Sequence, residues 1–184
     1  LNLTGVVQPS NRLSGMGYTT DAAGNVIADG VHSFTFDAEN HLLSTAQTGQ
    51  TTVTYQYDGD GKRVQKSSGV IYWYGLSSQP LVETNLTGGT LNAYYYFNGR
   101  LTNRRPWSHV FNLDTYVLDA LGSTNLVSGL NFSGSGAWDY SDYYPYGGEW
   151  AHQSNIGNHY KFTGKERDPE SGLDDSSARR VEHP

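Results

Sequence analysis

The sequence predicts an all-β fold of successive antiparallel β-hairpins that together form a twisted ribbon or an open sheet. Three observations support this prediction. The 184 residues include 14 Tyr and 22 Gly, and only 16% are charged, a composition that favours strands and turns over helices. Alternating apolar and polar residues recur along the chain, separated by Gly, Asp and Asn. No long stretch has the 3.6-residue period of an amphipathic helix.

The clearest hairpin lies near the end of the first third of the chain. Val53, Tyr55 and Tyr57 alternate with Thr and Gln, as in a half-buried strand. Asp58–Gly61 then supplies turn residues, because Gly adopts positive φ freely and Asp accepts hydrogen bonds from nearby backbone. Lys62–Lys66 follows as a second strand with charged residues toward solvent.

Two looser copies of this unit precede it, at Tyr18–Val26 and Phe34–Leu42. In each copy, an aromatic residue comes before an Asp that starts the turn, and an apolar residue begins the return strand. Asp21, Asp37 and Asp58 occupy this position in the three copies. The spacing of the copies fits two strands and their turns per unit.

Beyond Lys66 the pattern remains typical of strands. Strands are expected at Val70–Tyr74, Leu81–Thr84, Thr90–Phe97, Arg100–Thr102, Val110–Leu118 and Asn125–Val127. Asn98–Gly99 predicts a tight type I′ turn. Pro145 cannot donate to a sheet ladder, so Asp142–Glu149 is expected to be an edge strand or an irregular crossing. The best candidate for a helical turn is Pro169–Leu173.

Charge and composition argue against several classes of protein. The net charge of −6 and the isoelectric point of about 5.4 argue against a nucleic-acid surface. No apolar run is long enough for a transmembrane helix, and the absence of cysteine excludes disulfides. The first residue, Leu1, predicts a fragment or a processed piece. Asn2, Asn85 and Asn131 lie in N-x-S/T sequons, at a frequency expected by chance, so glycosylation stays open.

The repeated Y-x-Y-D units with a Gly-Lys/Arg turn resemble the YD repeats of RHS-repeat proteins. Four ordered blocks resemble the RHS repeat-associated core region: Tyr94–Arg105 (YYYFNGRLTNRR), Asp119–Val127 (DALGSTNLV), Asp142–Glu149 (DYYPYGGE) and Tyr160–Asp174 (YKFTGKERDPESGLD). The likeness implies YD-repeat hairpins over residues 1–69 and a core-like β region over residues 70–184, continuous with the first. It also implies a bacterial protein, extracellular or envelope-associated, whose ribbon coils into a shell around a toxin or other cargo.

The resemblance implies no enzyme. RHS cores resemble intramolecular aspartyl proteases, but the acids for that cleavage lie downstream of the last matching block, and no residue here matches them. The Asp119 block also lacks the family's His. Over Gly172–Val181, polar residues replace the family's apolar strand residues, so we expect a truncated or altered end and loss of the last strand.

Paired carboxylates are the remaining candidates for chemistry. The pairs are Asp58 with Asp60, Asp139 with Asp142, Asp168 with Glu170, and Asp174 with Asp175. Each pair lies near turn residues, so a structural role is expected. Asp58–Gly61 resembles the start of a calcium loop but lacks the later ligands. His152 and His159 do not meet a metal-ligand spacing, so neither a metal nor another cofactor is expected.

The leading hypothesis is a non-catalytic structural or interaction ribbon that self-associates through sheet edges, as an oligomer or a filament. One alternative is a carbohydrate-binding surface module, and another is a remnant of a toxin-encapsulating RHS shell that needs its upstream repeats. The candidate interface or sugar-stacking residues are aromatic: Tyr94, Tyr95, Tyr96, Phe97, Trp107, Tyr143, Tyr144 and Tyr146. For the carbohydrate-binding alternative, Trp73, Trp138 and Trp150 are further residues that could stack on sugar faces.

Overall fold

The computed structural model describes residues 15, 17–108, 113–130, 137–145 and 147–175, and the statements below concern these residues. They contain fourteen strands and one short 3₁₀ helix. Neighbouring strands are antiparallel and follow one another in chain order. The all-β prediction is therefore confirmed. The chain divides after Ser68 into two compact units, which are described in turn.

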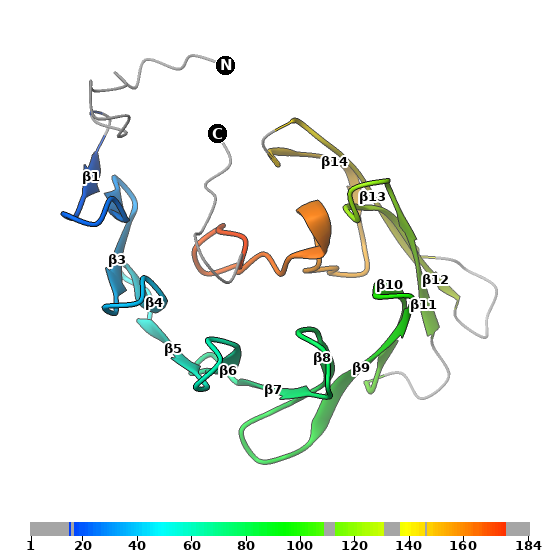
Figure 1. The fold of residues 1–184 in the computed structure, drawn as a ribbon. Helices are drawn as coiled ribbons and strands as arrows, with labels where there is room; N and C mark the ends of the chain where they lie inside the picture. Colours follow the sequence, from blue (N-terminus) through cyan, green and yellow to red (C-terminus); the bar gives the residue numbers. More distant parts are fainter. Residues whose placement is uncertain (1–14, 16, 109–112, 131–136, 146, 176–184) are drawn as a thin grey trace. The chain divides into compact units, whose positions relative to one another are not determined.

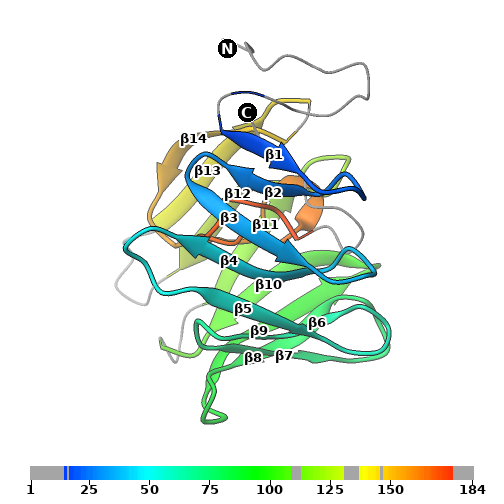
Figure 2. The same cartoon turned by 90° about the vertical axis from the view of Figure 1, so that its left-hand side faces the viewer.

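The first unit contains six strands, which lie side by side in Figure 2. Their bounds are β1 Tyr18–Thr20, β2 Val26–Asp29, β3 His32–Phe36, β4 Leu42–Gln47, β5 Val53–Tyr57 and β6 Arg63–Lys66. Phe34, Leu42 and Tyr55 are almost fully buried and form the apolar face. The prediction that the charged residues of β6 point toward solvent was wrong for Arg63 and Lys66, which are 2% and 4% exposed. The guanidinium of Arg63 lies 5.4 Å from the centre of the Tyr55 ring, and this cation–π contact accounts for its place on the apolar face.

One turn geometry recurs in the first unit and explains its hairpins. The Asp58 carboxylate accepts hydrogen bonds from the backbone N–H groups of Asp60 and Lys62, both at 2.9 Å. Asp37 makes the same pair of bonds to Glu39 and His41, both at 2.8 Å. The Asp therefore satisfies two backbone donors that the turn leaves free, which is why the repeat keeps this residue type.

The second unit contains eight strands and the 3₁₀ helix. Their bounds are β7 Val70–Tyr74, β8 Pro80–Thr84, β9 Thr90–Phe97, β10 Arg100–Pro106, β11 Leu113–Leu118, β12 Thr124–Leu130, β13 Ala137–Tyr143, β14 Glu149–Ser154 and η1 Phe162–Gly164. The sheet order within the unit follows the chain without a crossover. The strand pairs of the unit, such as β13 with β14, are antiparallel.

One prediction for the second unit was wrong, and another holds only for a single turn. Asp142–Glu149 is not a strand crossing; the end of β13, a turn around Pro145 and the first residue of β14 share it, and the Tyr144 N–H donates to the Gly148 carbonyl at 2.8 Å. Pro169–Leu173 contains one turn, in which the Gly172 N–H donates to the Asp168 carbonyl at 2.7 Å, as in a helix. The turn does not continue as a helix, because Gly172 leaves the helical region with a φ of 69°.

Residues 155–175, called the strap below, return across one face of the second unit's sheet after β14 ends. Figure 1 shows the part of the strap around η1, in orange, beside β10–β13. Tyr160 of the strap packs in one buried cluster with Tyr94, Leu101, Tyr116 and Val127 from four strands. The face that the strap covers is called the inner face, and the opposite side the outer face.

Candidate functional site: a polar network beneath the strap

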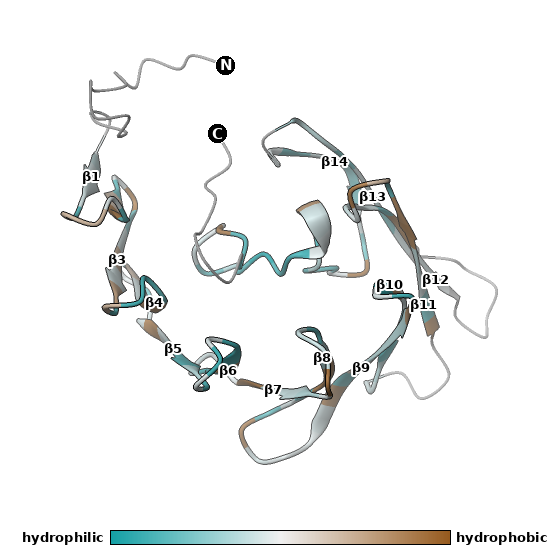
Figure 3. Ribbon diagram, viewed as in Figure 1, coloured by the Kyte–Doolittle hydropathy of each residue, from teal (hydrophilic) through white to brown (hydrophobic). Residues whose placement is uncertain are grey.

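The strap is a polar segment that is nevertheless buried. Its ribbon has largely hydrophilic colours in Figure 3, yet six of its polar residues are almost completely buried: Asn158, Lys161, Glu166, Asp168, Ser171 and Asp174. Burial of polar groups is unfavourable unless hydrogen bonds replace those made to water. The sheet supplies such bonds to Asn158, Lys161 and Glu166, which fixes the strap to the inner face. Ser171 and Asp174 form hydrogen bonds to other residues of the strap.

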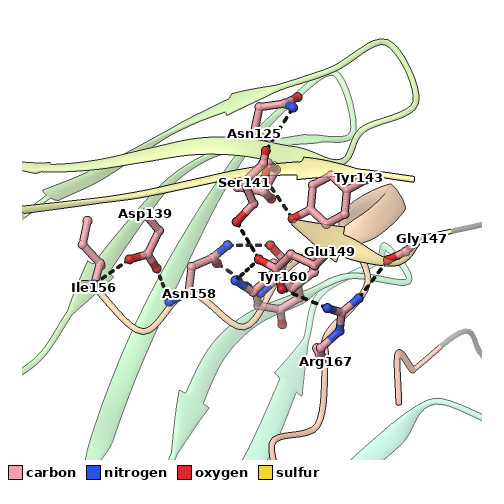
Figure 4. A network of polar contacts seen from close by, with 12 residues as sticks. Asn125, Asp139, Ser141, Tyr143, Gly147, Glu149, Ile156, Asn158, Tyr160 and Arg167 are labelled. Carbon is pink, nitrogen blue, oxygen red and sulfur yellow. Dashed lines mark hydrogen bonds and ion pairs between the residues drawn. The ribbon is translucent and has the colours of Figure 1, made fainter. Parts of the chain in front are cut away.

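Asp139 on β13 fixes the start of the strap. Its carboxylate accepts three backbone hydrogen bonds, from Asn155 at 2.5 Å and from Ile156 and Asn158 at 2.8 Å each (Figure 4). Asp139 is 3% exposed, so these bonds form away from bulk water. A charged acceptor in such surroundings makes hydrogen bonds of about twice the strength of neutral ones. The bonds set the direction in which the chain leaves β14.

Arg104 on β10 holds the same part of the strap from the other side. Its guanidinium forms a buried ion pair with Asp114 on β11 at 2.7 Å. It also points N–H groups at the carbonyls of Ile156 and Gly157, at 3.3 and 3.5 Å. Asp114 compensates the charge of Arg104, while the remaining donors contact the strap backbone. One side chain thus joins two strands to the strap.

Asn158 uses both ends of its amide. Its oxygen accepts a bond from the Tyr116 hydroxyl at 3.1 Å and another from the Tyr160 N–H at 3.1 Å. Its nitrogen donates to the Tyr160 carbonyl at 2.6 Å. Burial raises the pKa values of the Tyr116 and Tyr160 hydroxyls, so these phenols stay neutral and can donate. Tyr160 is held in the core by polar contacts as well as by packing.

A second buried cluster lies at the middle of the strap. The His159 Nε2 atom lies 3.2 Å from a Glu83 carboxylate oxygen on β8 and 3.0 Å from the Tyr94 hydroxyl on β9. Asn92 donates to the other Glu83 oxygen at 2.7 Å. Burial alone raises the pKa of the Glu83 carboxyl, but the charge and hydrogen bond of His159 outweigh this and hold it below its usual value.

A third cluster joins the strap to the end of the sheet. Glu149, the first residue of β14, accepts bonds from Ser141 at 2.6 Å, Lys161 at 2.8 Å and Arg167 at 2.9 Å. Arg167 also forms a bidentate pair with Asp174, at 2.7 and 3.1 Å. Figure 4 shows Glu149 between Ser141 and Arg167. Burial would raise the pKa of the Glu149 carboxyl, but Lys161, Ser141 and Arg167 lower it overall.

Two further bonds attach the later part of the strap. The Tyr72 hydroxyl on β7 donates to Glu166 at 2.8 Å. The Ser123 hydroxyl accepts the Thr163 N–H at 3.1 Å, where the short 3₁₀ helix meets β12. The network therefore extends from β7 to β14. Its carboxylates accept hydrogen bonds from cations and from backbone donors, an arrangement suited to holding the strap.

The aromatic candidates of β9 divide between the two faces. Tyr94 is buried on the inner face, and Tyr96 is partly buried, with its hydroxyl donating to the Pro80 carbonyl at 2.9 Å. Tyr95 and Phe97 alternate with them and are exposed. The structure thus places one pair of these rings in the core and the other pair toward solvent.

The other candidates lie in separate places. Tyr143 is partly buried and donates to the Thr124 carbonyl at 3.0 Å. Trp107 is half exposed, and the Arg105 guanidinium lies over it, 4.9 Å from the centre of the Trp107 ring. Tyr144 is exposed in the β13–β14 turn. Tyr146 lies outside the described residues, as do Asn2 and Asn131 of the sequons.

The outer face of β13 and β14 carries an aromatic group that joins two of the predicted tryptophans, Trp138 and Trp150, to two residues that were not predicted, Tyr140 and His152. Trp138, Tyr140 and Trp150 are 46%, 42% and 59% exposed. The His152 ring stacks on Tyr140 at 4.6 Å and is tilted against Trp150 at 5.0 Å. These four residues are called the aromatic platform below. The alternation of residues along β13 places Trp138 and Tyr140 on the same face. The sequence did not predict β14, which supplies the other two residues of the platform.

His41 lies close to two carboxylates in a turn of the first unit. Its Nδ1 atom lies 3.0 Å from Asp37 and 3.7 Å from Glu39, and the ligand-type atoms of these three residues lie within 4.8 Å of one another. The Asp37–His41 hydrogen bond and the turn account for this arrangement. The site is an exposed turn cluster in the first unit and not part of the strap network.

The sequence and the fold were compared with those of known proteins. No family model matches the sequence. The chain is 35% identical over 82 residues to the tRNA nuclease WapA of Bacillus subtilis, a region that covers 41% of this chain and 4% of the relative. A tRNA3(Ser)-specific nuclease WapA of Bacillus spizizenii matches to the same extent. The chain therefore spans about 4% of the length of these relatives.

Solved structures show the same fold. A TcdB2–TccC3 crystal structure superposes with a TM-score of 0.60 at 22% identity, over 88% of this chain and 9% of that one. A Tc holotoxin pore of Photorhabdus luminescens gives 0.64 at 21% identity, over 94% and 10%. The resemblance to RHS/YD-repeat regions is thereby confirmed, as a distant similarity to a small part of long toxin proteins.

None of the helices in the described part of the chain has the length and apolarity needed to cross a membrane.

Proposed function

We propose that this chain is a non-catalytic wall segment of an RHS/YD-repeat protein, in which the strap fixes the inner face of the sheet and the sheet edges pair with further strands. The strap network supports the structural role, because it uses charged groups as fixed partners. The fold similarity to the TcdB2–TccC3 structures supports a wall segment. An extracellular or envelope-associated bacterial location follows from the same family resemblance.

The exposure of edge strand β14 is the observation that supports pairing at the sheet edge. In the described part of the chain it pairs with β13 only, and five of its six residues, Trp150–Ser154, are exposed. Natural edge strands are usually protected by Lys, Pro or a covering segment. Strand β14 has neither Lys nor Pro. We propose that a second copy, or an adjoining repeat of a longer protein, completes this edge, and that repeated pairing builds an oligomer or filament.

Light scattering coupled to size-exclusion chromatography tests this proposal. The intact chain at micromolar concentration is expected to elute above its 20.3 kDa monomer mass. Ala151→Lys places a charge on the edge and should shift the protein toward monomer. Leu121→Lys, in an exposed turn, is the matched control and should not. A clean wild-type monomer would rule out self-association.

The third reading, a remnant of a toxin-encapsulating shell, predicts a different behaviour. The isolated chain would aggregate and become soluble only when co-expressed with preceding repeats. Soluble, monodisperse oligomers of the isolated chain would favour self-association over this reading.

A second candidate function is carbohydrate binding, and the aromatic platform favours it. Flat, half-exposed Trp and Tyr rings on one sheet face can stack on sugar rings, and His152 bonds to Asp142 beside them at 2.9 Å. Titration of tryptophan fluorescence with a glycan panel tests this candidate. A shift that Trp150→Ala abolishes and Trp107→Ala preserves would support it, and no shift with any glycan would eliminate it.

A further inference from the structure

We propose that His159 is a pH-sensitive latch: its protonated imidazole clamps the strap to β8 and β9, and loss of the proton loosens the strap from the inner face. This inference goes beyond the proposed wall function and does not depend on the identity of the partner at the sheet edges.

The position of His159 gives it control over the strap. It lies next to Tyr160, whose ring packs in the core against Tyr94 at 5.1 Å. Its carbonyl accepts the Arg167 N–H at 2.7 Å, which joins the two halves of the strap. A shift of His159 would therefore disturb both the core packing of Tyr160 and the return of the strap.

The groups around His159 favour its charged form. Glu83 from β8 lies in direct contact and is 3% exposed at its side chain, whereas the His159 side chain is 24% exposed. Glu166 of the strap adds a second negative charge, and Arg104 from β10 opposes both. Tyr94 from β9 and the neighbouring Tyr160 are neutral phenols. The partly exposed imidazole can exchange its proton with solvent, while the carboxylate it contacts stays buried.

The protonation of His159 is therefore linked to closure of the strap. Burial alone lowers the pKa of His159, but the Glu83 carboxylate outweighs it, and the pKa is raised above its usual value. A group whose pKa is raised by folding stabilises the closed state below its ordinary pKa and loses that contribution as pH rises through the raised value. The strap is thus latched at mildly acidic pH and loosens on the alkaline side. Glu83 protonation removes the same pair at the acidic extreme.

Two measurements on the intact chain test the latch. In NMR titrations, the His159 ring signal, assigned by its absence in His159→Gln, should titrate above the ordinary pKa of a histidine. Tryptic cleavage after Lys161 and Lys165 is followed from pH 6.5 to 9 and normalised to an unfolded peptide of the same sequence. Cleavage should accelerate with pH, by about tenfold for each unit by which the folded protein raises the His159 pKa.

Variants separate the latch from ordinary structural effects. His159→Gln keeps a hydrogen-bonding side chain but cannot titrate, so its normalised cleavage should not change with pH. Glu83→Gln should lower the titration midpoint of His159. His152→Gln is the matched control and should keep the wild-type pH dependence. A flat cleavage profile in the wild type, or an equal effect of His152→Gln and His159→Gln, would overturn the proposal.

Discussion

In the second unit, single carboxylates that accept several backbone hydrogen bonds fix the path of the chain, and Asp139 is the clearest example. It lies in a strand, so it does not initiate a turn as its sequence context suggested. Its neighbour along the strand, Asp142, faces the outer side and contacts His152. Sequence alternation places the two acids on opposite faces, but the residues that Asp139 binds follow β14, so nothing local indicates its role.

Asp139→Asn tests this role. The amide places an N–H group against backbone donors and removes the charge, so we expect the free energy of unfolding to fall by about 2 kcal/mol. Asp142→Asn, on the same strand but about half exposed, should change it by no more than about 0.5 kcal/mol. Equilibrium urea unfolding at neutral pH measures both. Equal effects of the two variants would show that the three backbone bonds to Asp139 contribute little.

At the scale of elements, the hairpins could be predicted from sequence and the strap could not. The β5–β6 hairpin follows from local chemistry: alternating Val53, Tyr55 and Tyr57, then an Asp that bonds to its own turn. The strap has no period and few apolar residues, and its partners are distant, as the Tyr72–Glu166 bond shows. Strand β14 was missed for a similar reason, because its sequence has no clear alternation of apolar residues.

The turn of the β5–β6 hairpin gives a second prediction. Gly61 has a φ of 75°, and a Cβ added there would lie 2.8 Å from the His41 Nε2 atom. Gly61→Ala is therefore strained in its backbone and also crowds His41, and we expect a loss of about 1–3 kcal/mol. Gly59 lies in the same turn, and an added Cβ there meets nothing within 4 Å. Gly59→Ala should be close to neutral in thermal unfolding, and a similar loss for both variants would contradict the assignment.

At the scale of the whole molecule, the two units use the same hairpin chemistry but differ in what stabilises them. In the described part of the first unit, side-chain hydrogen bonds such as that from Tyr57 to the Leu42 carbonyl join neighbouring hairpins. The second unit has in addition a segment that contacts strands from β7 to β14. Family resemblance indicated a wall-like ribbon, and the comparisons agree on the fold. The resemblance did not indicate that residues 155–175 would lie in the core of the sheet they follow.

The strap is an integral part of the second unit's core. Amide hydrogen exchange of the intact chain at pH 6, where the strap is latched, tests it most directly. The Ile156 and Asn158 amides, which bond to Asp139, should be protected to about the same degree as those of Tyr116 and Val127 in β11 and β12. Exchange of the strap amides near the rate of an unfolded peptide, with the strand amides still protected, would contradict the account.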